Sequence, residues 1–349
     1  LIFKQASGTS RGVLTTKETY LLEISKNGQK GIGECAIFRG LSYDDVPDYE
    51  EKLTWLCENI NLDFEVLKKE LLHYPSIIFG LEQALLNLQH GEDLYFPSDF
   101  TDGKDSIKIN GLIWMGNADF MQSQIEEKLA KGFDCIKLKI GVDWKSEKEI
   151  IKKLREKFPK EQLELRVDAN GAFSYEEATI VLQELADLGI HSIEQPIKKS
   201  EVRSPKSEEN SEKNSTDCCD PWIEMAKLCA ETPTPIALDE ELIGVIDFEE
   251  KKKLLETIKP QYIILKPALV GGFSGSDEWI AIAESLGINW WITSALESNI
   301  GLNAICQYTY TKKNPLPQGL GTGALFTNNF ETHLQLEGDQ MWHKKTPYY

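Results

Sequence analysis

Two lysines lie two residues apart in the stretch 135–141, which reads Cys-Ile-Lys-Leu-Lys-Ile-Gly. The apolar residues and the final glycine predict a short buried strand. Because side chains alternate along a strand, Lys137 and Lys139 point to the same face. Burying two ammonium groups side by side is costly unless anionic groups surround them. Taken alone, the stretch is typical of a surface strand with a solvated lysine face, so the rest of the chain must decide.

Charged residues also end other apolar stretches of the chain. Asp168 ends Leu-Arg-Val-Asp, Glu194 ends Ser-Ile-Glu, Asp239 ends Ala-Leu-Asp and Lys266 ends Ile-Leu-Lys. One charged residue at the start of a loop is ordinary. Five consecutive strands that end in the order Lys-Asp-Glu-Asp-Lys are hard to explain as solvated loop starts. In a barrel of parallel strands the C-terminal ends converge on the active-site face, so we expect these charges to meet there.

The expected meeting of these charges has a chemical consequence. Three converging carboxylates repel one another unless a cation lies among them. An oxygen donor set without His or Cys suits a hard ion, so we expect Mg²⁺, with Mn²⁺ as the alternative. A lysine beside a dication is favoured in its neutral form and can act as a base. The metal would stabilise the oxyanion that forms when a proton leaves the carbon next to a carboxylate, which predicts a small-molecule carboxylate substrate.

The elements that must position these charges follow a regular spacing. Helical stretches alternate with candidate strands that recur roughly every 27 residues and end near Asn110, Lys137, Asp168, Glu194, Asp239, Lys266, Thr293 and Leu320. One longer interval contains residues 198–220, which are poor in apolar residues and rich in Ser, Glu, Lys and Asn, and this composition predicts a mobile insertion. Eight such units predict a (β/α)8-type barrel over 105–325. A doubly wound open sheet is the alternative, but the glycine-rich turn typical of its first strand is missing.

The first hundred residues have a different pattern. A strand is expected over 13–24, a turn at Asn27-Gly28 and a returning strand over 31–38. Helices are expected over 44–72 and 74–90. A loop rich in glycine and serine, residues 7–12, precedes the first strand. This loop is either a plain surface connection or a mobile lid in which Arg11 meets an anionic substrate.

Composition excludes several classes of protein. The 349 residues carry a formal net charge of -18, which argues against nucleic acid as a partner. No apolar run is long enough to cross a bilayer, so we expect no membrane partner. The seven cysteines are scattered, without a CxxC pair or a Cys/His zinc spacing. They indicate a reducing compartment and a cytoplasmic protein.

The combined motif resembles the enolase superfamily, whose sites pair a lysine or histidine base with Mg²⁺. Lysines on the second and sixth strands resemble its muconate-lactonizing subgroup. This resemblance implies an α/β fold with a modified TIM barrel of (β/α)7β type. It also implies an α+β capping domain over 1–104 and a C-terminal segment, 326–349, that returns to the capping domain. The resemblance implies that Lys139 is the general base, with Lys137 beside it, and that Lys266 places an ammonium group on the opposite face of the substrate. It also implies that the metal ligands are Asp168, Glu194 and Asp239.

Within this subgroup, the stretches 294–301 and 319–323 most resemble dehydratases of menaquinone biosynthesis. Their substrate is 2-succinyl-6-hydroxy-2,4-cyclohexadiene-1-carboxylate. The resemblance implies substrate contacts from Ser294, Gly321, Thr322 and Arg11.

Several alternatives remain open from the sequence. An N-acylamino-acid racemase uses the same two lysines. A dipeptide epimerase typically carries Asp-x-Asp on the eighth strand, and residues 319–326 contain no carboxylate. A barrel that binds phosphate or a nucleotide through the glycines at 319, 321 and 323 is a third alternative, although a short glycine triplet is weak evidence. The oligomeric state is left open.

Overall fold

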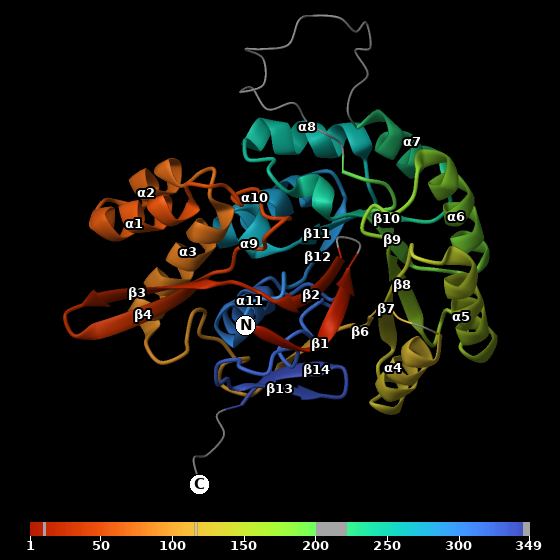
Figure 1. Ribbon diagram of the computed structural model, residues 1–349, viewed down its shortest axis with the longest axis horizontal. Coiled ribbons are helices and arrows are strands. Elements are labelled where there is room, and N and C mark those ends of the chain that lie inside the picture. Colours follow the sequence, from red (N-terminus) through yellow and green to blue (C-terminus); the bar gives the residue numbers. More distant parts are fainter. Residues whose placement is uncertain (10–11, 115, 117, 200–221, 345–349) are drawn as a thin grey trace, which may run out of the picture.

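The computed structural model describes residues 1–9, 12–114, 116, 118–199 and 222–344. Figure 1 shows a curled sheet ringed by helices, with a smaller group of strands and helices on one side of it. None of the helices in these ranges is long and apolar enough to span a membrane.

The larger part is built on one parallel sheet. The sheet runs in the order β12-β11-β10-β9-β8-β7-β6. Its seven strands are β6 (Gly111–Ile113), β7 (Cys135–Lys139), β8 (Glu164–Asp168), β9 (Ser192–Glu194), β10 (Ile236–Leu238), β11 (Tyr262–Leu265) and β12 (Asn289–Ile292). Beyond both edges, Gln318 bridges to Ile109 and Gly319 bridges to Thr293, each in parallel orientation. These bridges close the sheet at the eighth strand position, so the predicted α/β class and modified barrel are confirmed.

Helices cover the outer face of this sheet (Figure 1). They are α4 (Ala118–Ala130), α5 (Trp144–Lys157), α6 (Tyr175–Asp187), α7 (Ile223–Glu231), α8 (Phe248–Ile258), α10 (Gly272–Ser285) and α11 (Asn299–Thr311). The short helix α9 (Pro267–Val270) follows β11 and packs against α3 and α10. The start of α6 illustrates how sequence sets a boundary. Ser174 accepts a hydrogen bond from the Glu177 amide, and the Glu177 side chain accepts one from the Ser174 amide, which forms a capping box.

The smaller part contains two hairpins and three helices. They are β1 (Ile2–Thr9), β2 (Gly12–Thr16), β3 (Tyr20–Lys26), β4 (Gln29–Cys35), α1 (Tyr49–Asn59), α2 (Phe64–Glu70) and α3 (Pro75–His90). Helix α3 packs directly on β4. At this crossing a Cβ added to Gly33 would lie only 1.9 Å from the Gly80 carbonyl oxygen. A glycine is therefore required at position 33.

Two buried glutamates join the smaller part to the barrel. Glu34, at the end of β4, accepts hydrogen bonds from the backbone amides of Ser298 and Gly301 at the start of α11. Glu82 on α3 accepts hydrogen bonds from the backbone amides of Phe273 and Ser274 at the start of α10. Carboxylates are favourable at helix N-termini, so these contacts hold the two parts together.

A third sheet contains the C-terminal strands. It has the order β13-β14-β5, from β13 (Leu334–Glu337), β14 (Gln340–His343) and β5 (Ser106–Lys108). The C-terminal hairpin thus pairs with the strand that directly precedes the barrel. The division of the chain at 104/105 and 325/326 stays a prediction.

Several local expectations were wrong. The single strand expected over 13–24 is divided between β2 and β3, and the helix expected over 44–72 is divided between α1 and α2. Residues 7–9 of the expected loop belong to β1, where Ser7 pairs with Leu14. The first barrel strand begins after Asn110 and does not end there. Of the predicted insertion, residues 200–220 lie outside the described residues.

Candidate active site

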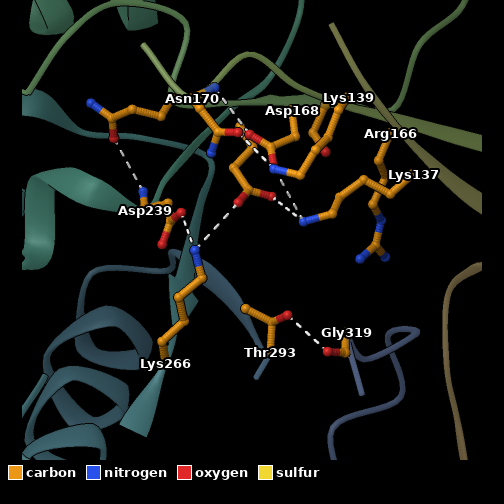
Figure 2. A network of polar contacts seen from close by, with 12 residues as sticks. Lys137, Lys139, Arg166, Asp168, Asn170, Asp239, Lys266, Thr293 and Gly319 are labelled. Atoms are coloured by element: carbon orange, nitrogen blue, oxygen red, sulfur yellow. Dashed lines mark hydrogen bonds and ion pairs between the residues drawn. The ribbon is translucent and has the colours of Figure 1, made fainter. Parts of the chain in front are cut away.

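The two lysines of β7 meet carboxylates from the next two strands (Figure 2). Lys137 Nζ lies 2.7 Å from Glu194 Oε2 and 3.6 Å from Asp168 Oδ2. Lys139 Nζ lies 2.9 Å from the same Asp168 oxygen. Both lysines line one cavity at the C-terminal ends of the strands. The predicted shared face therefore points inward, into an anionic environment.

Lys266 approaches the carboxylates of Glu194 and Asp239 from the other side of the barrel (Figure 2). It follows β11, which lies four places from β7 in the sheet order. Its ammonium donates a hydrogen bond to Asp239 Oδ2, and it lies 3.9 Å from Glu194 Oε1. Lys266 and Glu194 line the cavity, and Asp239 lies behind this lining, in contact with Lys266. The five charged side chains predicted at the strand ends are thus brought together.

Burial and charge shift the acidities of this network. Burial alone would raise the pKa of Asp168, but the ammonium of Lys139 helps to hold that pKa below its usual range. Burial, together with the Asp168 carboxylate, raises the pKa of Glu194 to about 7. Burial alone would lower the pKa of Lys266, but the carboxylates of Asp239 and Glu194 raise it above its usual range. Burial also raises the pKa of Asp239 above its usual range. At both Glu194 and Asp239, burial therefore outweighs the effect of the nearby ammonium groups.

Asn170 is a member of the network that the sequence reasoning did not assign. Its Oδ1 accepts a hydrogen bond of 2.6 Å from Lys139 Nζ, and its Nδ2 donates one of 3.2 Å to Glu240 Oε1. The backbone of Asn170 is left-handed, with φ of 45°, a conformation that asparagine tolerates better than most residues. Its place two residues after Asp168 was a weak signal, because any polar residue can stand in such a loop.

The cavity has a volume of about 230 Å³ and a mixed lining. Three predicted substrate-binding residues, Ser294, Gly321 and Thr322, line it. Ser294 Oγ lies 2.5 Å from Thr322 Oγ1. Apolar walls come from Leu14, Phe38, Leu112, Trp114 and Leu296, none of which was assigned from the sequence. The fourth predicted substrate contact, Arg11, lies outside the described residues.

Comparison with known proteins places this site in a family. The family described as enolase C-terminal domain-like matches residues 121–206 and 217–342, more than half of the chain. The chain belongs to the enolase superfamily. The resemblance noted from the strand-end residues is thereby confirmed.

Individual members of the superfamily are similar over nearly the whole chain. The o-succinylbenzoate synthase of Desulfotalea psychrophila is 42% identical, over 97% of this chain and 95% of its own length. The crystal structure of MenC from Desulfotalea psychrophila LSv54 has a TM-score of 0.82 and 39% identity, and covers 98% of this chain and 97% of that one. The N-succinylamino acid racemase of Thermus thermophilus is 34% identical, over 84% of this chain and 75% of its own length.

Enzymes of the enolase superfamily use Mg²⁺, so the three carboxylates can be compared with the ligands that this ion requires. Asp168, Glu194 and Asp239 supply only oxygen atoms, the donors that Mg²⁺ prefers. Glu194 Oε1 is buried and has no hydrogen-bond partner among the described residues, so a cation would satisfy it. In the described ranges, however, the three carboxylates do not bring one oxygen each within 4.8 Å of one another. The ammonium groups of Lys137 and Lys266 lie between them. The donor set fits a divalent cation, which would require the carboxylates to draw together.

Proposed function

We propose that this chain is an o-succinylbenzoate synthase, a carbon–oxygen lyase. It would dehydrate 2-succinyl-6-hydroxy-2,4-cyclohexadiene-1-carboxylate to o-succinylbenzoate in menaquinone biosynthesis. The observation that carries the proposal is the 42% identity to an o-succinylbenzoate synthase over 97% of the chain. The site supports it, because lysines from opposite sides of the barrel border one cavity.

The two lysines at this cavity have different tasks in the proposed reaction. Lys139 takes the proton from the carbon next to the substrate carboxylate. The ammonium so formed donates the same proton to the departing hydroxyl, and water leaves. Because one group performs both transfers, proton and hydroxyl leave from the same face of the ring. Lys266 stays protonated, as its carboxylate neighbours favour, and its charge stabilises the electron-rich ring from the other face.

Asp168, Glu194 and Asp239 would hold the metal ion, Mg²⁺ or alternatively Mn²⁺. When bound, that ion supplies positive charge for the negative charge that develops on the substrate carboxylate. Lys137, between Asp168 and Glu194, supports the network by balancing their charge. We propose that it also modulates the basicity of Lys139. Ser294, Thr322 and the backbone at Gly321 are the proposed substrate contacts, because they line the same cavity.

A second activity, the racemisation of N-succinylamino acids, has its own support. The racemase of Thermus thermophilus is 34% identical to this chain. Racemisation needs an acid and a base on opposite faces of one carbon, and Lys139 and Lys266 provide such a pair. Its substrate and the cyclohexadiene both carry a succinyl group and a carboxylate, so one cavity could serve both reactions.

The test is an assay of purified protein with the cyclohexadiene substrate and, in parallel, with N-succinylamino acids, each with and without Mg²⁺. We expect Mg²⁺-dependent formation of the aromatic product. Lys139→Ala and Lys266→Ala should abolish this activity, while circular dichroism shows an unchanged fold. Lys131→Ala is the control, because Lys131 is an exposed lysine that pairs with Glu127. Near-normal turnover in either active-site variant would contradict the assignment.

A further inference from the structure

A second cluster of ionisable side chains lies outside the barrel cavity. Asp93 follows α3, His333 precedes β13 and His343 ends β14. Asp93 Oδ2 lies 2.6 Å from His333 Nδ1 and 3.0 Å from His343 Nε2. One ligand atom from each of the three residues lies within 4.8 Å of the others. We propose that this Asp93–His333–His343 cluster binds a transition-metal dication of the Zn²⁺ class.

The ligand chemistry differs from that of the barrel. Imidazole nitrogens combined with a carboxylate oxygen suit Zn²⁺ and its neighbours in the first transition row, whereas an all-oxygen set suits Mg²⁺. Three protein ligands with a position left for water make a common zinc arrangement. About a quarter of the Asp93 and His333 side-chain surface is exposed, whereas His343 is fully buried. An ion could therefore enter from solvent on the side of Asp93 and His333.

Unsatisfied polar atoms at the cluster favour a ligand over a simple hydrogen-bonded triad. Asp93 Oδ1 is buried and has no hydrogen-bond partner within the described part of the chain. Both imidazoles approach the other oxygen, Oδ2, so the two rings leave Oδ1 unused. An unpartnered buried carboxylate oxygen costs free energy. A cation at this carboxylate would remove that cost.

The fold holds the three ligands in place before any ion binds. Asn303 and Gln307 on α11 both donate hydrogen bonds to the Asp93 carbonyl oxygen, at 2.9 and 2.8 Å. The C-terminal hairpin sets the two histidines side by side, because Leu334 pairs with His343 and directly follows His333. Preorganised ligands lose little conformational entropy on binding. The ion would tie the C-terminal hairpin to the connection after α3.

The test uses the full chain, stripped of metal and then supplied with excess Mg²⁺ for the barrel carboxylates. Co²⁺ is titrated as a probe, its visible absorption is recorded, and Zn²⁺ is added in competition. We expect one equivalent of Co²⁺ with an intense tetrahedral-type spectrum, displaced by Zn²⁺. His333→Gln and Asp93→Asn should each weaken Co²⁺ binding by about tenfold or more, in line with losses seen even for outer-shell partners. His333 is used because its side chain is partly exposed, whereas replacing the buried His343 risks the fold.

The control is His90→Gln, an exposed histidine three positions before Asp93 that should keep full Co²⁺ affinity. The proposal is overturned if parent and His333→Gln bind Co²⁺ with equal affinity, which would leave the cluster as a hydrogen-bonded triad. Dehydration in Mg²⁺ is measured separately on the same samples. His333→Gln should retain the parent's rate, so the metal cluster and the proposed dehydratase activity can fail independently.

Discussion

Replacing Asn170 by alanine tests how Lys139 is held for catalysis. The Asn170 side chain is the amide that contacts Lys139 Nζ, at 2.6 Å. Its other end is fixed by Glu240 at 3.2 Å. In the proposed reaction Lys139 becomes an ammonium after it takes the substrate proton, and Asn170 Oδ1 stabilises that ammonium. We therefore expect Asn170→Ala to slow turnover more than it weakens substrate binding.

The size of the effect follows from the type of hydrogen bond that is lost. A hydrogen bond to a charged group contributes about 1.5–3 kcal/mol, which corresponds to a loss of about ten- to a hundredfold in kcat. The loss should stay below that of Lys139→Ala, because Asp168 still contacts Lys139 at 2.9 Å. The left-handed backbone at Asn170 adds a separate cost of about 1 kcal/mol in stability when alanine stands there.

The assay is steady-state dehydration of the cyclohexadiene substrate, with kcat and KM determined separately. Asn27→Ala is the matched control. Asn27 is also left-handed, with φ of 53°, but stands in the exposed hairpin turn between β3 and β4. This control should lose a similar amount of stability and no activity. A parent-like kcat in Asn170→Ala, or an equal loss of kcat in Asn27→Ala, would refute the reasoning.

Three further changes have expected outcomes. Burial raises the pKa of Glu82 to about 7, so the folded state holds the Glu82 proton more tightly than the unfolded state does. The free energy of unfolding should therefore fall by about 3 kcal/mol as the pH rises from about 4.5 to 7. Urea unfolding at about pH 5 and about pH 8 should show that Glu82→Gln removes this dependence; an identical pH dependence in parent and variant would contradict the burial argument. Gly33→Ala should destabilise the folded chain by about 3 kcal/mol in thermal unfolding, because the added Cβ would clash with the Gly80 carbonyl oxygen. The control is Ser25→Ala at an exposed strand position, and its unfolding temperature should stay close to that of the parent. Asp239→Asn should weaken Mg²⁺ binding in calorimetry, and unchanged affinity would remove Asp239 from the proposed ligand set.

The sequence by itself determined the barrel and the kind of residue at its mouth. Five consecutive strands end with a local signal, an apolar run followed by a charge, and candidate strands recur with roughly the length of one strand–helix unit. Because parallel strands in a barrel point the same way, such ends converge whatever the details of packing. The meeting of Lys139, Asp168, Glu194 and Lys266 could therefore be predicted from the order of the residues alone. The break between β2 and β3 could not, since residues 13–24 read as one strand.

Only the tertiary structure decided which groups contact one another. That Lys137 lies between Asp168 and Glu194 depends on strand register and barrel curvature, which no local pattern encodes. Asn170 lies in the loop after β8, and the position of this loop depends on hydrogen bonds such as those from the Asn170 amide to Asp168 and from the Gly171 amide to the Gln195 carbonyl. The contacts of Asp93 with His333 and His343 span 240 and 250 residues of chain. The sequence contains no Cys/His zinc spacing that would have indicated this cluster. Its three ligands are far apart in the chain, and they come together only because β13 and β14 pair beside the connection that follows α3.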